Sequence, residues 1–367
     1  MMLSCLILVS LLLQVRLYHS PSGRLYFLNG LFYLLACAAK YNAVFLGFSF
    51  CAAHIFSIKK QSGTYSGLWN ARAVLFFGLG VILGGMLGFP IIQLSGGGDF
   101  IGSLVFEFKH LFVKGHPGLK ISGLDYFYMF HWLRSILPMA GYVLFGFMIG
   151  GIALFVFNAD KKKWIILFFA IPYYCAMEYI FKVAVDYERY VLPLVGIYVI
   201  CAVFAVQWLC CCIQSRFSRA NTIILYGLIV ILCAFPLYKT TRFLYTLDPD
   251  TRTQTKRWMK RNIPAGSKIA VHWPNSGYHP DLKKMGYEIV EVKSSEKNFS
   301  EIFFQSEYII VTSLCYDRYF RDTQGESPLK EYYKAVFAMG APVYEAVPSY
   351  MTYRIHNPVV KIYKVEI

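Results

Sequence analysis

The sequence predicts an α-helical polytopic membrane bundle over residues 1–238, followed by a small α/β domain over residues 239–367. Two observations on composition predict this class. Hydrophobic residues make up 57% of the 367 and charged residues only 16%, whereas an ordinary soluble domain has about 25% charged residues. The charges are also divided unevenly, with 24 among residues 1–238 and 33 among the remaining 129. The first region therefore has the composition of membrane segments, and the second that of a globular domain.

Apolar runs long enough to cross about 30 Å of hydrocarbon, roughly 20 residues each, define the predicted membrane segments. They lie near residues 72–94, 136–157, 164–184, 190–213 and 221–238, and a further apolar stretch covers residues 1–15. Residues 25–58 form a run that is too long for one ordinary span. Two interpretations are open for it: one long tilted helix, or two short segments that meet near Lys40. The total is seven or eight membrane segments.

The distribution of positive charge favours the two-segment interpretation and sets the orientation. It places ten positive residues in four short loops on one side, whereas Arg189 is alone in the short connection on the other side. Positive loops are cytoplasmic, and the ten residues are Arg16, Arg24, Lys59, Lys60, Arg72, Lys161, Lys162, Lys163, Arg216 and Arg219. We therefore expect a multi-pass protein of the cell membrane. Lys40, a long loop over residues 95–135 and the C-terminal domain are then extracytoplasmic.

The C-terminal domain alternates helical and extended patterns. An amphipathic helix is predicted over residues 251–262 and a second helix over residues 329–337. Strands are predicted over residues 268–271, 287–292 and 307–312, with a final β hairpin over residues 353–365. This alternation indicates a small α/β layer that is Rossmann-like at most.

Sequence motifs and the placement of basic residues limit which cofactors and partners the chain is expected to bind. The chain has no GxGxxG, GxxxxGK[ST], HExxH or CxxC pattern, so no nucleotide, zinc or redox motif is offered. Asp and His residues are scattered, and their spacing neither indicates nor excludes a divalent cation. The net charge of +15 comes largely from the ends of apolar runs rather than from a basic cluster with interleaved aromatic residues. Nucleic acid is therefore not an expected partner, whereas membrane lipids are.

Several short motifs together resemble a known family. They are AAKYN (38–42), GHPG (115–118), DYERYVLPL (186–194), DTRTQTKRWMKRNIPAGSKIAV (250–271), YIIVTSLCYDRYF (308–320) and VVKIYKV (359–365). With the multi-span pattern, they look like the GT-C glycosyltransferases, and more narrowly the bacterial relatives of dolichyl-phosphate-mannose protein mannosyltransferases and aminoarabinose transferases (glycosyltransferase family 39-like). The resemblance covers nearly the whole chain, although each motif is short.

The resemblance implies transfer of a sugar from a polyprenyl-phosphate or polyprenyl-diphosphate donor. The acceptor is a protein, a glycolipid or a polysaccharide on the outer face, and the sequence does not distinguish these. Such chemistry needs cations for the departing phosphate and a carboxylate for the acceptor. Lys40 and Arg189 are the candidate lipid-phosphate ligands, because Arg presents a fork to phosphate oxygens and a lysine inside an apolar run is costly. The alternatives are that Lys40 reaches out to the interface and that Arg189 pairs with a neighbouring carboxylate.

The carboxylate is harder to assign. Asp125, Asp186 and Glu188 are weak catalytic candidates, and His116 and Tyr190 are candidate substrate contacts. Enzymes of the GT-C family that the chain resembles carry an essential acidic residue in a first outer loop. In this chain, by contrast, the residues before Arg16 contain no Asp or Glu. Either the chain is a fragment that lacks N-terminal spans, or it is a shortened relative. In the second case its catalysis is altered or absent, and without catalysis it is a membrane scaffold or a lipid-carrier binding protein.

One further pair lies within a predicted span. Glu178 and Lys182 are four residues apart, a spacing that suits an ion pair on one helix face. We interpret this pair as structural.

Overall fold

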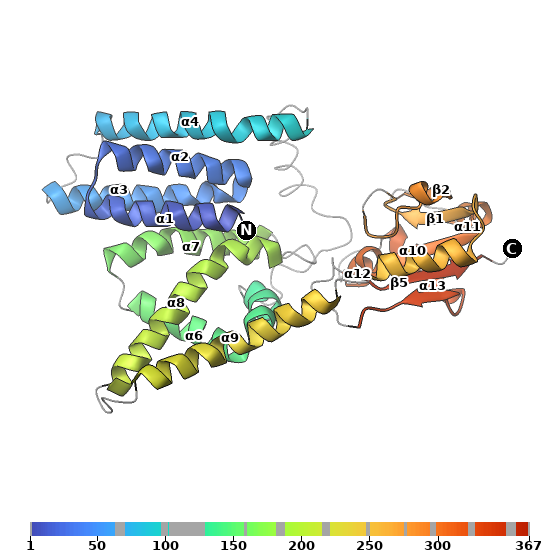
Figure 1. Ribbon diagram of the computed structural model, residues 1–367. Helices are drawn as coiled ribbons and strands as arrows, with labels where there is room; N and C mark the ends of the chain where they lie inside the picture. Colours follow the sequence, from blue (N-terminus) through green and yellow to red (C-terminus); the bar gives the residue numbers. More distant parts are fainter. Residues whose placement is uncertain are drawn as a thin grey trace. The chain divides into compact units, whose positions relative to one another are not determined.

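A computed structural model shows a mostly helical chain with a small sheet near its C-terminal end (Figure 1). The structure describes residues 2–62, 70–96, 102, 129–157, 160–180, 188–214, 221–246, 250–274, 277–293, 299–321, 327–349 and 357–365. The chain divides into two compact units, and the main boundary between them follows Pro236. Each unit is described by itself: the first is the helical unit, and the second is the sheet unit.

In its described residues, the helical unit consists of α-helices, one short 3-10 helix and one short π-helix. Its helices are α1 (Met2–His19), α2 (Gly23–Ala39), α3 (Leu46–Ser62), α4 (Ala71–Gly96), α6 (Leu137–Phe157), α7 (Lys161–Ile180), α8 (Glu188–Gln214) and the first part of α9 (Asn221–Thr246). The 3-10 helix η1 (Tyr41–Phe45) precedes α3, and the π-helix η3 (Trp132–Ile136) precedes α6. The shared apolar character of these segments explains why they are helical, because every backbone hydrogen bond of a helix is internal.

The apolar run of residues 25–58 is two segments and not one helix. Helix α2 ends at Ala39, and Lys40 is extended (φ −167°, ψ 130°). The two segments then fold back on each other, because the Tyr26 hydroxyl lies 2.8 Å from His54 Nδ1. The hairpin predicted from the charge distribution is therefore confirmed.

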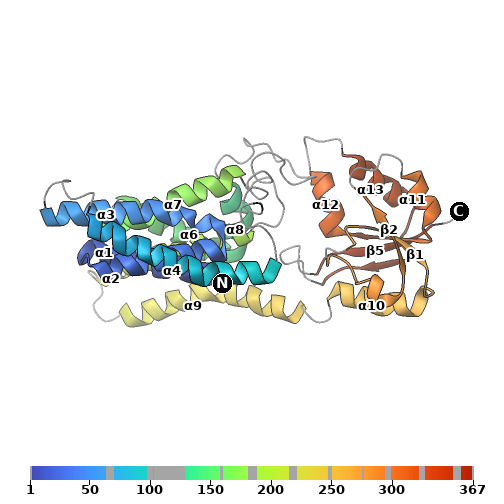
Figure 2. The ribbon, with the colours of Figure 1, turned by 90° about the horizontal axis from the view of Figure 1, so that it is seen from above.

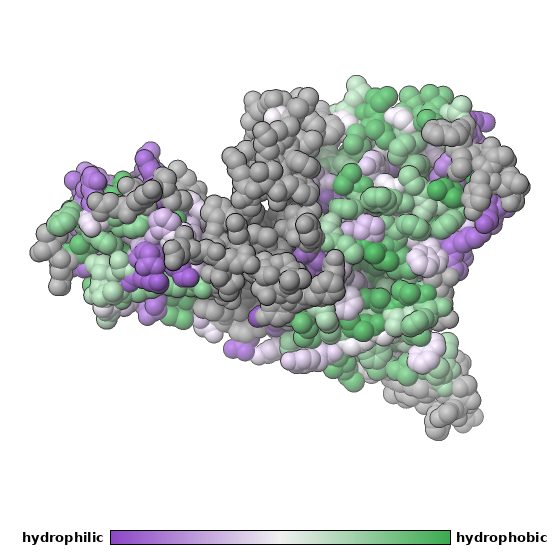
Figure 3. Space-filling model, turned by 180° about the vertical axis from the view of Figure 1, so that it is seen from behind, coloured by the Kyte–Doolittle hydropathy of each residue, from purple (hydrophilic) through white to green (hydrophobic). Residues whose placement is uncertain are grey.

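Five helical segments are long and apolar enough to cross a membrane: Met2–His19, Tyr41–Gln61, Ala71–Gly88, Trp132–Phe157 and Val191–Cys212. Helix α2 is apolar but shorter. Large apolar side chains cover the outside of α4, where Leu75, Ile82 and Met86 are 59%, 61% and 67% exposed. Figure 3 shows that much of this unit's surface is hydrophobic. Soluble monomers rarely expose a contiguous apolar surface of this size to water. The surface is instead typical of a protein in a membrane. Membrane crossing by α7 and α9 stays a prediction.

Glycines let pairs of helices approach closely. Figures 1 and 2 show α2 beside α4, and a Cβ added at Gly80 would overlap the carbonyl oxygen of Phe27. Helices α6 and α8 meet in the same way, where a Cβ at Gly151 would overlap the carbonyl oxygen of Cys201. Small residues at helix contacts are the usual packing device inside membranes, where no hydrophobic effect drives helices together.

The sheet unit holds a five-stranded mixed sheet in the order β2-β1-β3-β5-β4. Its strands are β1 (Lys268–His272), β2 (Glu288–Val292), β3 (Tyr308–Thr312), β4 (Tyr344–Ala346) and β5 (Val360–Lys364). Strand β1 is parallel to β2 and β3, whereas β5 is antiparallel to β3 and β4. The β hairpin predicted within residues 353–365 is therefore wrong, because both neighbours of β5 come from outside that range. Strand β5 pairs with β4, and residues 351–356 lie outside the described part.

Helices cover both faces of this sheet (Figure 2). Side chains alternate between faces along each strand, so Ile269 and Val271 pack with Met259 of α10 (Thr251–Asn262). Ala270 and Ile309 face the other way, toward α11 (Ser300–Gln305), α12 (Ser313–Arg321) and α13 (Pro328–Ala338). The predicted α/β layer, its first helix and its first three strands are confirmed.

Candidate functional site

A buried carboxylate joins two segments at one end of the helical unit. Glu178, near the end of α7, is 1% exposed. Its Oε1 accepts a hydrogen bond from the backbone N–H of His131 (2.8 Å) and another from the hydroxyl of Tyr174 (2.6 Å). The first N–H groups of a helix have no partner within that helix. Glu178 therefore acts as a cap, supplied by another helix, for the helical segment that begins at residue 130.

The imidazole of His131 continues this network. Its Nε2 lies 3.3 Å from the carbonyl oxygen of Met177, and its Nδ1 lies 3.4 Å from Ser135 Oγ. A carbonyl oxygen only accepts hydrogen bonds, so we assign the proton to Nε2 and let the Ser135 hydroxyl donate to Nδ1. Both hydrogen bonds hold the ring at 1% exposure.

The helix break at Lys40 lies against the same part of α7. The backbone N–H of Lys40 donates to Ala36 O, and its carbonyl oxygen accepts from Ala43 N, both at 3.0 Å. Two residues later, the buried Asn42 donates to Met177 Sδ at 3.8 Å. The half-buried Lys40 therefore belongs to a chain segment that contacts the residue preceding Glu178. We call Asn42, His131, Ser135, Tyr174 and Glu178 the polar cluster.

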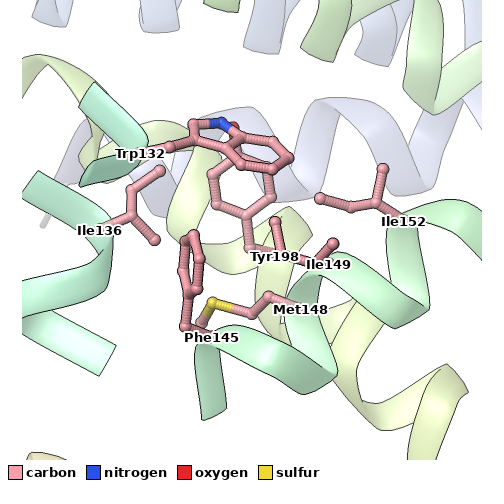
Figure 4. A pocket seen from close by; sticks show the side chains of 7 residues that line it. All are labelled: Trp132, Ile136, Phe145, Met148, Ile149, Ile152 and Tyr198. Carbon is pink, nitrogen blue, oxygen red and sulfur yellow. The ribbon is translucent and has the colours of Figure 1, made fainter. Parts of the chain in front are cut away.

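Figure 4 shows a narrow apolar hollow with no enclosed room for even a water molecule. Trp132 lines it directly after His131 in the chain, and the Trp132 ring packs edge-on against Tyr174 (ring centroids 5.9 Å apart). The other lining residues come from η3, α6 and α8 and are Ile136, Phe145, Met148, Ile149, Ile152 and Tyr198. A polar group and an apolar surface thus lie side by side, which suits an amphiphilic ligand.

The structure places one of the residues predicted for the site and leaves the others open. Lys40 lies at the helix break described above. Glu188, Arg189 and Tyr190 form the first turn of α8, and their side chains lie outside the described part. Asp125, Asp186 and His116 lie outside the described residues altogether, as does Lys182, the predicted partner of Glu178.

Sequence reasoning missed the network around Glu178. An acidic residue inside an apolar run was a usable signal, because intramembrane ionisable groups are costly. The partner was not readable, since His131 lies 47 residues away. In the described part of the chain, no group of three or more His, Cys, Asp or Glu side chains could hold a metal ion.

Comparisons with known proteins return no match: no family model, no curated protein and no solved structure is similar to this chain.

Proposed function

We propose that this chain is a multi-pass membrane glycosyltransferase of GT-C type. It moves a sugar from a polyprenyl-phosphate-linked donor to an extracytoplasmic protein, glycolipid or polysaccharide. One observation carries the proposal: a lysine at a break between two apolar helices lies two residues before Asn42 of the polar cluster, and the Trp132 ring packs against Tyr174 of that cluster. The motifs that resemble the GT-C family support it, and the five apolar helices suit a membrane protein.

Lys40 binds the phosphate of the donor in this proposal. A cation held among apolar helices acts in surroundings of low dielectric, where its attraction to an oxyanion exceeds that in water. Arg189, in the first turn of α8, supplies a planar fork that matches phosphate oxygens. Lys40 lies at the tip where the two short segments meet, and Arg189 lies at the short connection before α8. The positive-inside rule predicts an outer position for both.

The apolar hollow has no room for a hydrocarbon chain inside it, so we assign the first isoprene units of the lipid to the ring surface around it. Trp132, Phe145 and Tyr198 offer large rings to a hydrocarbon chain. The network around His131 and Glu178 would position this surface, because it caps the helical segment that carries Trp132.

The catalytic carboxylate of this proposal is Asp125, Asp186 or Glu188. Glu178 is not assigned that role, since it is buried and already accepts hydrogen bonds from a backbone N–H and from Tyr174. It is a positioning residue. A divalent cation is not required by the proposal.

A second candidate function is a lipid-carrier binding protein without transfer. It is favoured by one observation: in the described part of the helical unit, Glu178 is the only carboxylate side chain near the helix break, and it is buried. Asp160, the other acidic side chain described there, accepts from the backbone N–H groups of Lys162 and Lys163 at the start of α7, at the opposite end of that helix.

A transfer assay tests both. Membranes that contain the chain are given polyprenyl-phosphate donors with a radiolabelled sugar, and label in the acceptor fraction is counted. Transfer should fall at least about a hundredfold in K40A and R189A, since each loses charge-assisted hydrogen bonds to phosphate. K161A, which removes an exposed lysine at the start of α7, is the matched control. Equal transfer by K40A, R189A and K161A would overturn the enzyme proposal. No transfer, together with donor binding that K40A abolishes, would support the second candidate.

A further inference from the structure

The connections of the sheet unit define one switch point in its strand order. The chain runs from β1 outward to β2 and then back across to β3 on the other side of β1. The order of the strands therefore reverses between β1 and β3. In open α/β sheets, ligands bind at the carboxyl ends of the two strands that flank such a reversal.

The residues at these two carboxyl ends carry the right chemistry for an anion. Strand β1 ends at His272 and is followed by Trp273, whereas β3 ends at Thr312 and passes directly into α12. The two ends are adjacent, because Cys315 Sγ in the first turn of α12 lies 3.9 Å from the carbonyl oxygen of His272. A helix N-terminus carries a partial positive charge.

Arg318 adds a full positive charge one turn into α12. Its guanidinium lies over the Trp273 ring, 4.3 Å from the centroid, and its Nε donates to Leu314 O at 3.3 Å. Among the described residues it forms no ion pair. Trp273, whose ring lies under the Arg318 guanidinium, has a positive φ of 57°. A bulky residue in that region is strained, and such strain is concentrated at functional sites.

His272 supplies a second, independent observation. It is 3% exposed, its Nδ1 lies 2.8 Å from the Tyr333 hydroxyl on α13, and its Nε2 has no hydrogen-bond partner among the described residues. Burial, together with the charges of Arg318 and His279, lowers the pKa of His272 to about 4. At neutral pH the ring is therefore neutral and carries one N–H. Burial also raises the pKa of the Tyr333 hydroxyl, which stays protonated and can donate to Nδ1. We assign the one ring proton to Nε2, with the Tyr333 hydroxyl donating to Nδ1, which leaves Nε2–H a buried donor without an acceptor among the described residues.

We propose that the switch point at the carboxyl ends of β1 and β3 binds a phosphate-type oxyanion, held by the fork of Arg318 and the Nε2–H of His272 at the N-terminus of α12. The ligand completes the hydrogen bonding of the buried imidazole and pairs the guanidinium. Cys315 takes no part as a nucleophile, because burial raises the pKa of its thiol to about 11 and keeps it neutral. The phosphate comes from a lipid headgroup or from a water-soluble phosphate.

Calorimetric titration of the full chain in dodecyl maltoside, a detergent without phosphate, tests the proposal. The two probes are inorganic phosphate and a polyprenyl monophosphate carried in the same micelles. R318Q should weaken binding at least about tenfold, because hydrogen bonds to charged groups are worth about 1.5–3 kcal/mol. The matched control is R257Q, which removes the same charge from an exposed position on α10.

Two results support the site and name the source of the phosphate. If R318Q weakens binding of both probes, the site takes soluble phosphate. If only the polyprenyl monophosphate binds, and R318Q weakens it, the site takes a lipid headgroup. If circular dichroism shows that R318Q does not fold, phosphate binding is measured instead from the thermal unfolding of the wild type. Phosphate should raise its unfolding temperature, and R318K, which keeps the charge but not the fork, should shrink that rise.

The proposal fails if neither probe binds the wild type saturably, or if R318Q and R257Q bind alike. If inorganic phosphate does not bind, and polyprenyl monophosphate binding survives R318Q but is lost in K40A, this site is overturned and the proposed function of the helical unit stays intact.

Discussion

Removing the carboxylate of Glu178 should destabilise the helical unit more than any other single change in the polar cluster. Glu178→Ala removes the acceptor of two donors, the buried His131 N–H and the half-buried Tyr174 O–H. The loss of each such hydrogen bond costs about 1–3 kcal/mol, so the expected loss is about 2–6 kcal/mol. Glu178→Gln keeps an acceptor oxygen but loses the charge, and it should cost about 2 kcal/mol.

Tyr174→Phe separates the two hydrogen bonds. It removes one of them and leaves the cap on His131, so we expect a loss of about 1.5–3 kcal/mol. Tyr142→Phe is its matched control, because Tyr142 is 85% exposed on α6. The free energy of unfolding is measured by titration with sodium dodecyl sulfate in mixed micelles, followed by circular dichroism. The reasoning would be refuted if Glu178→Ala were no less stable than Tyr174→Phe, since the cap on His131 would then contribute nothing.

Three further changes test other parts of the fold. Gly80→Ala should destabilise the helical unit by about 1–3 kcal/mol in the same titration, because the new Cβ overlaps the Phe27 carbonyl; Gly78→Ala, with nothing within 4 Å, should be neutral or stabilising by up to about 1 kcal/mol. Between pH 6.5 and 4 the unfolded chain binds the His272 proton and the folded chain does not, so the wild type should lose about 3 kcal/mol of stability as the pH falls through this window; His272→Gln should flatten that dependence in denaturant titrations at each pH. Asp250→Ala removes the N-cap of α10 and should cost about 1–2 kcal/mol, whereas Asp250→Ser should restore most of it, as read from unfolding curves.

The helical hairpin and the α/β layer could be predicted because each leaves a local trace in the chain. Lys40 interrupts an apolar run, and the count of positive loops favours two segments over one. The strands near residues 268–271 and 307–312 each contain a continuous apolar run, residues 269–271 and 308–311, of the kind that a buried parallel sheet requires. Helix 251–262 begins at an Asp that serves as its cap.

The rest depends on contacts between distant residues. Strand β4 is only three residues long, too short for an alternating pattern, so the partner of β5 was assigned to the wrong segment. Glu178 stands out in the sequence, but its nearest polar residue along the same helix face suggests Lys182 as partner. The contact with His131 exists only because α7 and the segment before α6 are brought together by packing.

The position of β5 bears on when the sheet can form during synthesis. Strand β5 lies between β3 and β4, yet it is made after both. Until residues 360–364 emerge from the ribosome, β3 has one open edge and β4 has no neighbour. Apolar helices can enter the membrane one after another as they are made, whereas this layer waits for its last described strand. A ribosome stalled before β5 would therefore present an exposed edge of β3, which is a template for wrong pairing.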